Sequence, residues 1–128
     1  MTAYTIVNLK EIEDSAGEHS PGLEARFARR QIGSEHLGIS FLRYAPGFRS
    51  RMGHSHRQQE ELYLVVGGSG SVRLDDEIVA LGPWDLVRVA PATVRAFEAG
   101  RDGLELVAVG SDRPEGGDGV VTPEWWVD

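Results

Sequence analysis

A chain of 128 residues with no cysteine and a net charge of −7 excludes several classes of protein. It can form no disulfide, and it offers no thiolate as a metal ligand or nucleophile. The acidic balance argues against nucleic acid as a partner, because that binding needs a basic face.

The length predicts a single domain with a real hydrophobic core. With 41% hydrophobic residues and a mean hydropathy of −0.26, the composition is typical of a soluble globular protein. No apolar run approaches the ~18 residues of a membrane-spanning helix, and the first residues do not have the pattern of a signal peptide. We therefore expect a cytoplasmic protein without a membrane partner.

The first third of the chain contains short apolar segments separated by turn residues. We expect a strand from Tyr4 to Leu9, followed by a polar stretch that ends in the turn Ser20-Pro21-Gly22. The segment from Leu23 to Ile32 fits either a helix or a strand, and we favour the strand. Residues Leu37 to Tyr44 have the alternation of a clear strand.

The stretch from Gly47 to Gly70, GFRSRMGHSHRQQEELYLVVGGSG, contains the residues with the most distinctive chemistry. His54 and His56 are one residue apart, so in an extended strand both imidazoles project from one face. Glu61 opens the run ELYLVV, which predicts a second strand ending in a turn at Gly67 to Gly70. The carboxylate can then face the two imidazoles, although a solvated polar hairpin would also explain HSHRQQEE.

More short strands follow. Asp75-Asp76 lies between two apolar runs and predicts a hairpin, and a turn at Gly103 is expected before the last clear strand. The expected strands are Ser71 to Leu74, Glu77 to Leu81, Leu86 to Val89, Val94 to Glu98 and Leu104 to Val109. Nine or ten strands at such spacings predict an all-β sandwich or barrel.

The end of the chain is rich in turn residues. We expect residues 110–122 to form a mobile tail. Trp125 and Trp126 follow it, and aromatic side chains of this size seldom lie free in water. They are expected to dock on the barrel wall or on a partner subunit.

The spacing around the histidines resembles the first motif of the cupin superfamily: Gly, five residues, His-x-His, three or four residues, Glu, six residues, Gly. His54, His56, Glu61 and Gly68 fit this pattern, while Gly47 lies one residue further upstream than the pattern asks. A second, altered cupin motif follows, in which Ala90, Ala92 and Ala99 replace the usual proline, glycine and asparagine. Arg95 takes the place of the histidine that is the family's fourth metal ligand.

This resemblance implies an all-β fold, a small double-stranded β-helix or jelly-roll barrel. The barrel core would span residues 37–110, with N-terminal strands and a loop in 1–36 covering it and a C-terminal tail in 111–128. It also implies a divalent transition metal, Zn, Fe, Ni, Mn or Co, held by His54, His56 and Glu61. Single-domain cupins often pair, so a homodimer is expected.

Two classes of function stay open from the sequence. One is a metal-dependent enzyme that acts on a small molecule; the other is a metal-free barrel that binds or senses a small ligand, with Glu61 paired to Arg95. If Arg95 faces the cavity, it can hold an anionic substrate by a bidentate contact; otherwise it turns to solvent or pairs with Glu98. Tyr63 shares the face of Glu61 and either lines the substrate pocket or is a buried barrel aromatic.

Overall fold

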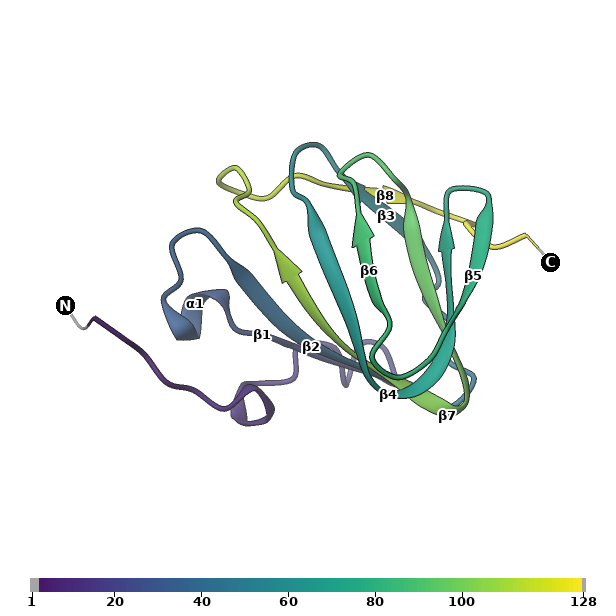
Figure 1. The fold of residues 1–128 in the computed structure, drawn as a ribbon, viewed down its shortest axis with the longest axis horizontal. Coiled ribbons are helices and arrows are strands. Elements are labelled where there is room, and N and C mark those ends of the chain that lie inside the picture. The colour runs from purple at the N-terminus through teal and green to yellow at the C-terminus, as the bar shows by residue number, and fades with distance from the viewer. Residues whose placement is uncertain (1–2, 128) are drawn as a thin grey trace.

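One long strand, β7 (Arg95–Gly110), holds together most of the sheet in the computed structural model, which describes residues 3–127 (Figure 1). It pairs with β2 (Gly38–Tyr44), β3 (Gly53–His56) and β4 (Glu61–Leu74), all antiparallel. The remaining elements are η1 (Leu9–Glu11), β1 (Leu23–Phe27), α1 (Arg29–Ile32), β5 (Glu77–Leu81), β6 (Leu86–Val89) and β8 (Gly119–Thr122).

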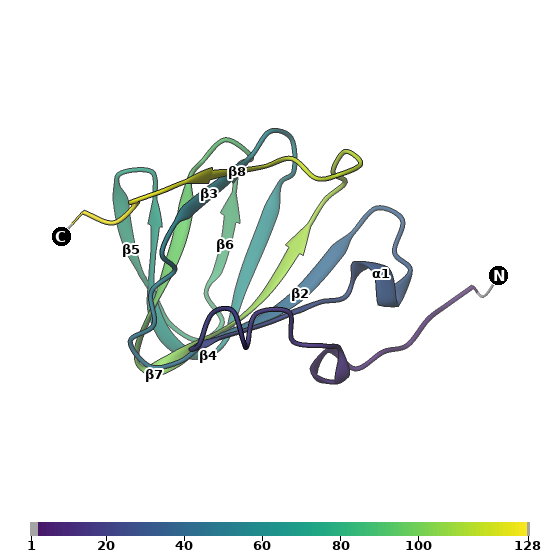
Figure 2. The same ribbon diagram turned by 180° about the vertical axis from the view of Figure 1, so that it is seen from behind.

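The eight strands form one curled sheet, so the expected all-β jelly-roll barrel is confirmed. The path β1-β2-β7-β3-β8 makes one side, and β4 adds β5 and β6 on the other (Figures 1 and 2). No helix among the described residues is long and apolar enough to cross a membrane.

The core is made by alternate residues of β4 and β7. Val65 and Val72 are fully buried, as are Leu104 and Leu106. Burying a side chain of this kind contributes ~1.5–3 kcal/mol, so the inward rows of these two strands hold the barrel closed. Aromatic residues fill the space between these rows and the cavity: Tyr44, Tyr63 and Phe97.

Two glycines explain why β4 and β7 continue where the sequence predicted turns. Gly68 and Gly103 have φ angles of 71° and 80°, a conformation that glycine adopts without steric cost. A Cβ on Gly68 would lie 2.1 Å from the carbonyl oxygen of Gly103, and the register of the two strands shifts on either side of Gly68. The turns expected at Gly67 to Gly70 and at Gly103 are therefore wrong: β-bulges bend two continuous strands there.

The hairpin predicted around Asp75-Asp76 is confirmed. β4 and β5 pair from Gly70↔Leu81 to Leu74↔Glu77, which leaves the two aspartates as the turn.

The N-terminal predictions need correction. Residues 4–8 form no strand, and the 3-10 turn η1 follows them. The chain then crosses the outside of the sheet, where the Arg26 guanidinium donates to the carbonyl of Ile12. The strand favoured for Leu23 to Ile32 is right only as far as Phe27, because the backbone N–H of Ile32 bonds to the carbonyl of Ala28 and closes the helical turn α1.

The segment expected to be a mobile tail contains strand β8. All four residues of β8 pair with β3, from Gly53↔Thr122 to His56↔Gly119, and the two strands lie side by side in both ribbon views (Figures 1 and 2). The sequence predicted a mobile tail because residues 110–122 contain many glycines. Val120, Val121 and Thr122 nevertheless form a strand, because the folded sheet presents the free edge of β3 with which they can pair.

Both tryptophans pack on their own barrel wall, the first of the two expected positions. A Cβ on Gly53 would lie 2.8 Å from Cγ of Trp125, so the indole sits directly on the strand that contains the histidines. The indole N–H of Trp126 donates to the carbonyl of Ser50 at 2.6 Å. The end of the chain therefore supports β3 from outside.

Candidate metal centre and cavity

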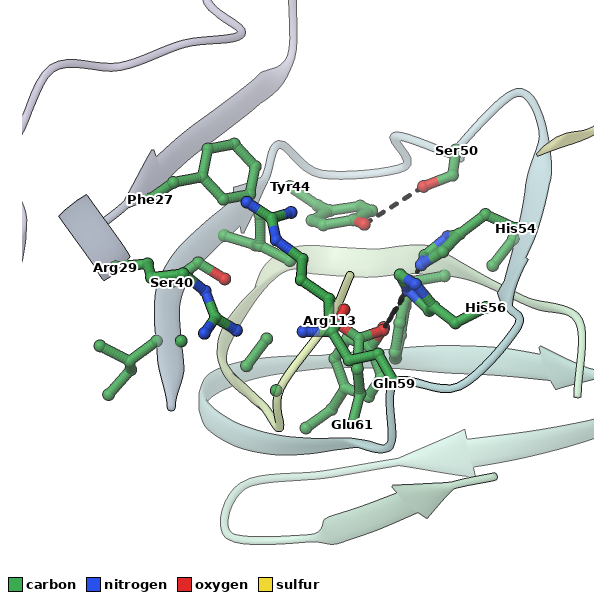
Figure 3. A pocket seen from close by; sticks show the side chains of 18 of the residues that line it. Phe27, Arg29, Ser40, Tyr44, Ser50, His54, His56, Gln59, Glu61 and Arg113 are labelled. Carbon is green, nitrogen blue, oxygen red and sulfur yellow. Dashed lines mark hydrogen bonds and ion pairs between the residues drawn. The ribbon is translucent and has the colours of Figure 1, made fainter. Parts of the chain in front are cut away.

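The two histidines of the His-x-His motif lie on one face of β3, as the alternation predicted. Strand β3 lies between β7 and β8, where His54 is the register partner of Arg95 on one side and of Val121 on the other. The imidazole rings of His54 and His56 are 5.2 Å apart, edge to face. Both side chains point into the barrel, toward the start of β4 (Figure 3).

Glu61, the first residue of β4, brings its carboxylate to these imidazoles. Its Oε1 atom lies 3.1 Å from Nε2 of His56 and 3.5 Å from Nε2 of His54. One ligand atom from each of the three residues lies within 4.8 Å of the others. Among residues 3–127 this is the only group of at least three histidine and acidic side chains close enough to share an ion.

The donor set fits a transition-metal ion. Two donors bound to one ion at ~2.1 Å, with an angle of ~90–110° between them, are about 3.0–3.4 Å apart, close to the separations of Glu61 Oε1 from the two imidazole nitrogens. Neutral imidazole and carboxylate are ligands that Zn, Fe, Ni, Mn and Co accept. The arrangement has two histidines and one carboxylate, which leaves coordination positions for other molecules.

The surroundings of Glu61 keep it ionised. Burial alone would raise the pKa of this carboxyl, but interactions with His54, Tyr63 and His56 outweigh burial and lower the pKa to about 2. The Tyr63 hydroxyl donates to Oε1 at 2.6 Å. At neutral pH the carboxylate is therefore charged and available to a cation.

Asp118 orients His56 and was missed by the sequence analysis. Its Oδ1 atom lies 2.9 Å from Nδ1 of His56, while Oδ2 accepts the backbone N–H groups of Gln58 and Gln59, each at 2.8 Å. Burial raises the pKa of Asp118, but these hydrogen bonds prevail and lower it to about 2. When the proton of His56 is on Nδ1 and is donated to Asp118, the lone pair on Nε2 is free for a metal ion, as is usual for a histidine ligand.

No local signal in the sequence could have found Asp118. It is 62 residues from His56 and lies in a glycine-rich segment without a motif. The pairing of β8 with β3 is what places its carboxylate beside the imidazole.

Arg95 does not line the cavity, which corrects its expected role as a substrate anchor. Its side chain is fully buried, with Nη1 donating to the carbonyl of His54 at 3.4 Å and Nη2 to that of Ala90 at 3.2 Å. Nη1 also lies 4.0 Å from Oε1 of Glu61. The expected inward direction is right, but the guanidinium lies behind the histidines, where its charge faces Glu61. Glu98, the other partner considered, pairs with Arg49.

Tyr63 satisfies both interpretations that its position allowed. It lines the cavity and is also only 3% exposed, with its ring centroid 4.8 Å from that of Phe97. Burial raises its pKa well above the usual value, with the Glu61 charge adding to the effect. The hydroxyl therefore keeps its proton and donates it to Glu61.

The cavity in front of these residues has a volume of about 560 Å³, which suits a small molecule. His54, His56 and Glu61 lie at one side of it, and Phe27 and Arg29 at the other (Figure 3). Strands β1, β2, β3, β4 and β7 all contribute to its walls. The curled sheet therefore places the candidate metal centre inside a cavity that is open to small molecules.

Comparisons with known proteins find likeness in structure alone. No protein-family model and no curated protein matches the chain. A cupin protein from Bacteroides fragilis is 20% identical with a TM-score of 0.73, and the match covers 88% of this chain and 86% of that chain. KdgF from Halomonas sp. is 19% identical with a TM-score of 0.72, covering 90% and 98%. A variant of the oxalate decarboxylase of Bacillus subtilis is 24% identical with a TM-score of 0.72, covering 89% of this chain but 32% of that chain.

Proposed function

This chain is a cupin by its fold, and from that premise we propose that it binds one divalent transition-metal ion and acts on a small molecule in the barrel. His54, His56 and Glu61 hold the ion, and the cavity of about 560 Å³ receives the molecule. The observation that carries the proposal is the approach of three potential ligand atoms within 4.8 Å of one another at the wall of that cavity.

Each residue around the centre has a distinct part. A bound Zn, Fe, Ni, Mn or Co ion would polarise an oxygen of the small molecule as a Lewis acid. Asp118 sets the tautomer of His56, and the Tyr63 hydroxyl holds the carboxylate of Glu61 in position. The oxalate decarboxylase with the same fold supports an enzymatic reading.

The alternative is a barrel that binds a small ligand without metal and without turnover. One observation favours it: the guanidinium of Arg95 lies where the cupin pattern has a histidine, 4.0 Å from Glu61 Oε1. A fixed positive charge there compensates the carboxylate and opposes a second cation nearby.

Elemental analysis decides between the two. Protein purified without added metal, and protein loaded with each of the five metals and desalted, should contain about one ion per chain. His56→Ala should lose it, because one ligand of three is removed. The exposed His19→Ala is the matched control and should keep the ion. Full occupancy in His56→Ala contradicts the assignment, and no ion in the wild-type protein under any loading supports the metal-free alternative.

We also propose a homodimer, formed through the outer face of β4 and β6. Leu62, Val66 and Leu86 are 36%, 36% and 63% exposed there, because their neighbours Tyr63, Val65 and Val87 point inward. An apolar row of this kind suits a protein interface, and two-fold dimers are the commonest oligomer. The expected interface at Trp125 and Trp126 is less suitable, since both rings already pack on their own barrel.

Light scattering after size exclusion tests the dimer. The wild-type protein should have the mass of two chains at micromolar concentration, and Leu86→Glu should have the mass of one. Leu37→Glu, at a residue 58% exposed outside β4 and β6, should remain dimeric. A wild-type monomer would reject the proposal.

A further inference from the structure

Two arginines line the cavity in addition to the residues of the candidate metal centre. Arg29 is the first residue of α1, and Arg113 follows β7. Figure 3 shows Arg29 on the side of the cavity opposite His54 and His56, with the Arg113 side chain between the two groups in this view. Neither residue belongs to a motif that the sequence analysis recognised.

The charge around the cavity has the opposite sign to that of the whole chain. The chain has a net charge of −7, yet Glu61 is the one acidic residue among those that line the cavity, against two arginines. The buried charges just behind the wall, Arg95 beside Glu61 and Asp118 beside His56, have opposite signs. Arg29 and Arg113 therefore make the cavity attractive to anions, while the outer surface repels them.

These two arginines have no carboxylate partner among residues 3–127. The Arg29 guanidinium donates to the carbonyl of Ser111 at 2.9 Å, which uses one of its five N–H donors. Four other arginines pair with acids within 4.0 Å: Arg26 with Glu24, Arg49 with Glu98, Arg88 with Glu60 and Arg95 with Glu61. What distinguishes Arg29 and Arg113 from the remaining arginines is that they line the cavity. The acceptors missing at Arg29 and Arg113 are those that an anionic ligand would supply.

The rest of the wall is largely apolar. Phe27, Ile39, Leu42 and Met52 line the cavity, and Phe27 and Met52 are 54% and 51% exposed. Several neutral polar groups are already engaged: Ser50 donates to the Tyr44 hydroxyl, Gln59 to the carbonyl of Ser111, and Tyr63 to Glu61. A sugar would find few free partners here, whereas an apolar body would bury surface against Phe27 and Met52.

We propose that the molecule received by this cavity is a small organic acid with an apolar body. Its carboxylate binds Arg29 and Arg113, its apolar body lies against Phe27 and Leu42, and its other end faces His54, His56 and Glu61. This deepens the proposed function and rests on it for the role of the metal, but anion binding by the two arginines can be tested separately. The specificity residues of the site are then Arg29 and Arg113, in place of the expected Arg95.

Calorimetric titration with small probes tests the proposal. The probes are acetate, benzoate, phenylacetate and 3-phenylpropanoate, together with phenylacetamide as the neutral counterpart and glucose 6-phosphate as a polar anion. The wild-type protein should bind an aromatic carboxylate at least tenfold more tightly than phenylacetamide or acetate, because a charged acceptor and apolar contact both contribute.

Arginine variants test whether the carboxylate of the probe binds at Arg29 and Arg113. Arg29→Gln and Arg113→Gln should each weaken binding of the best carboxylate about tenfold, the size expected from losing a charge-assisted hydrogen bond. Their affinity for phenylacetamide should not change. The control is Arg30→Gln, which removes an exposed charge from the same helical turn outside the cavity lining and should bind as the wild type does.

Metal content, measured on the same samples, separates the two proposals. Arg29→Gln and Arg113→Gln should contain as much metal as the wild type. If no sample contains metal but the arginine dependence holds, the metal centre is refuted and the anion site stands. Equal binding of acid and amide, no binding of any carboxylate, or variants that bind like the wild type overturns the anion site whatever the metal content. Tighter binding of glucose 6-phosphate than of the aromatic acids overturns the apolar body.

Discussion

Replacing Asp118 with Asn should reduce metal affinity through a residue that never touches the metal. The carboxylate uses both oxygens: Oδ1 faces Nδ1 of His56, and Oδ2 accepts the backbone N–H groups of Gln58 and Gln59. An amide has only one oxygen, so the asparagine side chain could accept hydrogen bonds either from His56 or from the two backbone N–H groups, but not from both. If the oxygen keeps the backbone donors, the NH₂ group faces His56 and favours a lone pair on Nδ1. The proton then moves to Nε2, the nitrogen that faces Glu61.

The size of the effect follows from these contacts. Loss of a residue that orients a metal-ligating histidine typically weakens metal affinity about 10–100-fold. In the metal-free protein, hydrogen bonds to an ionised carboxylate become hydrogen bonds to a neutral amide, which costs ~1–2 kcal/mol. For a domain of this length, that corresponds to a fall in Tm of about 3–10 °C.

Two measurements on one pair of variants test this reasoning. Competition with a chromophoric chelator reports metal affinity, and circular dichroism of metal-free protein reports Tm. Asp112→Asn is the matched control, since Asp112 is exposed in the same segment and its only side-chain hydrogen-bond partner within residues 3–127 is His36, at 3.3 Å. Wild-type metal affinity in Asp118→Asn, with a lowered Tm, would show that Asp118 merely anchors β8. No change in either quantity would refute the whole argument.

Two further predictions concern charge at the centre. Arg95→His should tighten metal binding, because residue 95 is the register partner of His54 and the new imidazole could serve as a further ligand. The change also removes a positive charge that lies 4.0 Å from Glu61 Oε1. An equal or weaker affinity in chelator competition would contradict this prediction. In metal-free protein, Asp118 and Glu61 have pKa values lowered to about 2 from 3.8 and 4.5, so they contribute stability that is complete above about pH 5 and lost as the pH falls toward 2. Urea unfolding between pH 2 and 6 measures this, and a flat free energy of unfolding over that range is the contrary result.

Errors in the fold prediction have a common cause. The turns expected at Gly67 to Gly70 and at Gly103 were inferred from glycine, which permits turns but also permits close approach of two backbones. Only the crossing of β4 and β7 shows which use applies, since a Cβ on Gly68 would collide with the carbonyl of Gly103. The strand expected from Tyr4 to Leu9 has the right alternation but no partner strand among the described residues.

By itself the sequence determined the strands of the barrel core, the Asp75-Asp76 hairpin and the proximity of His54, His56 and Glu61. The shared face of His54 and His56 and the Asp75-Asp76 hairpin depend on local rules, because side chains at i and i+2 share a face of a strand and a two-residue turn brings the next strand alongside. Glu61 lies near the histidines because it follows them closely in sequence, although β3 and β4 do not pair. The tertiary structure alone decided which residues surround the three candidate metal ligands. Asp118 reaches His56 because β8 pairs with β3, Arg95 is buried behind the histidines, and Arg29 meets Arg113 at one cavity. Each of these depends on which distant strands become neighbours, and register between distant strands is set by packing of the whole sheet and by no pattern within a single segment.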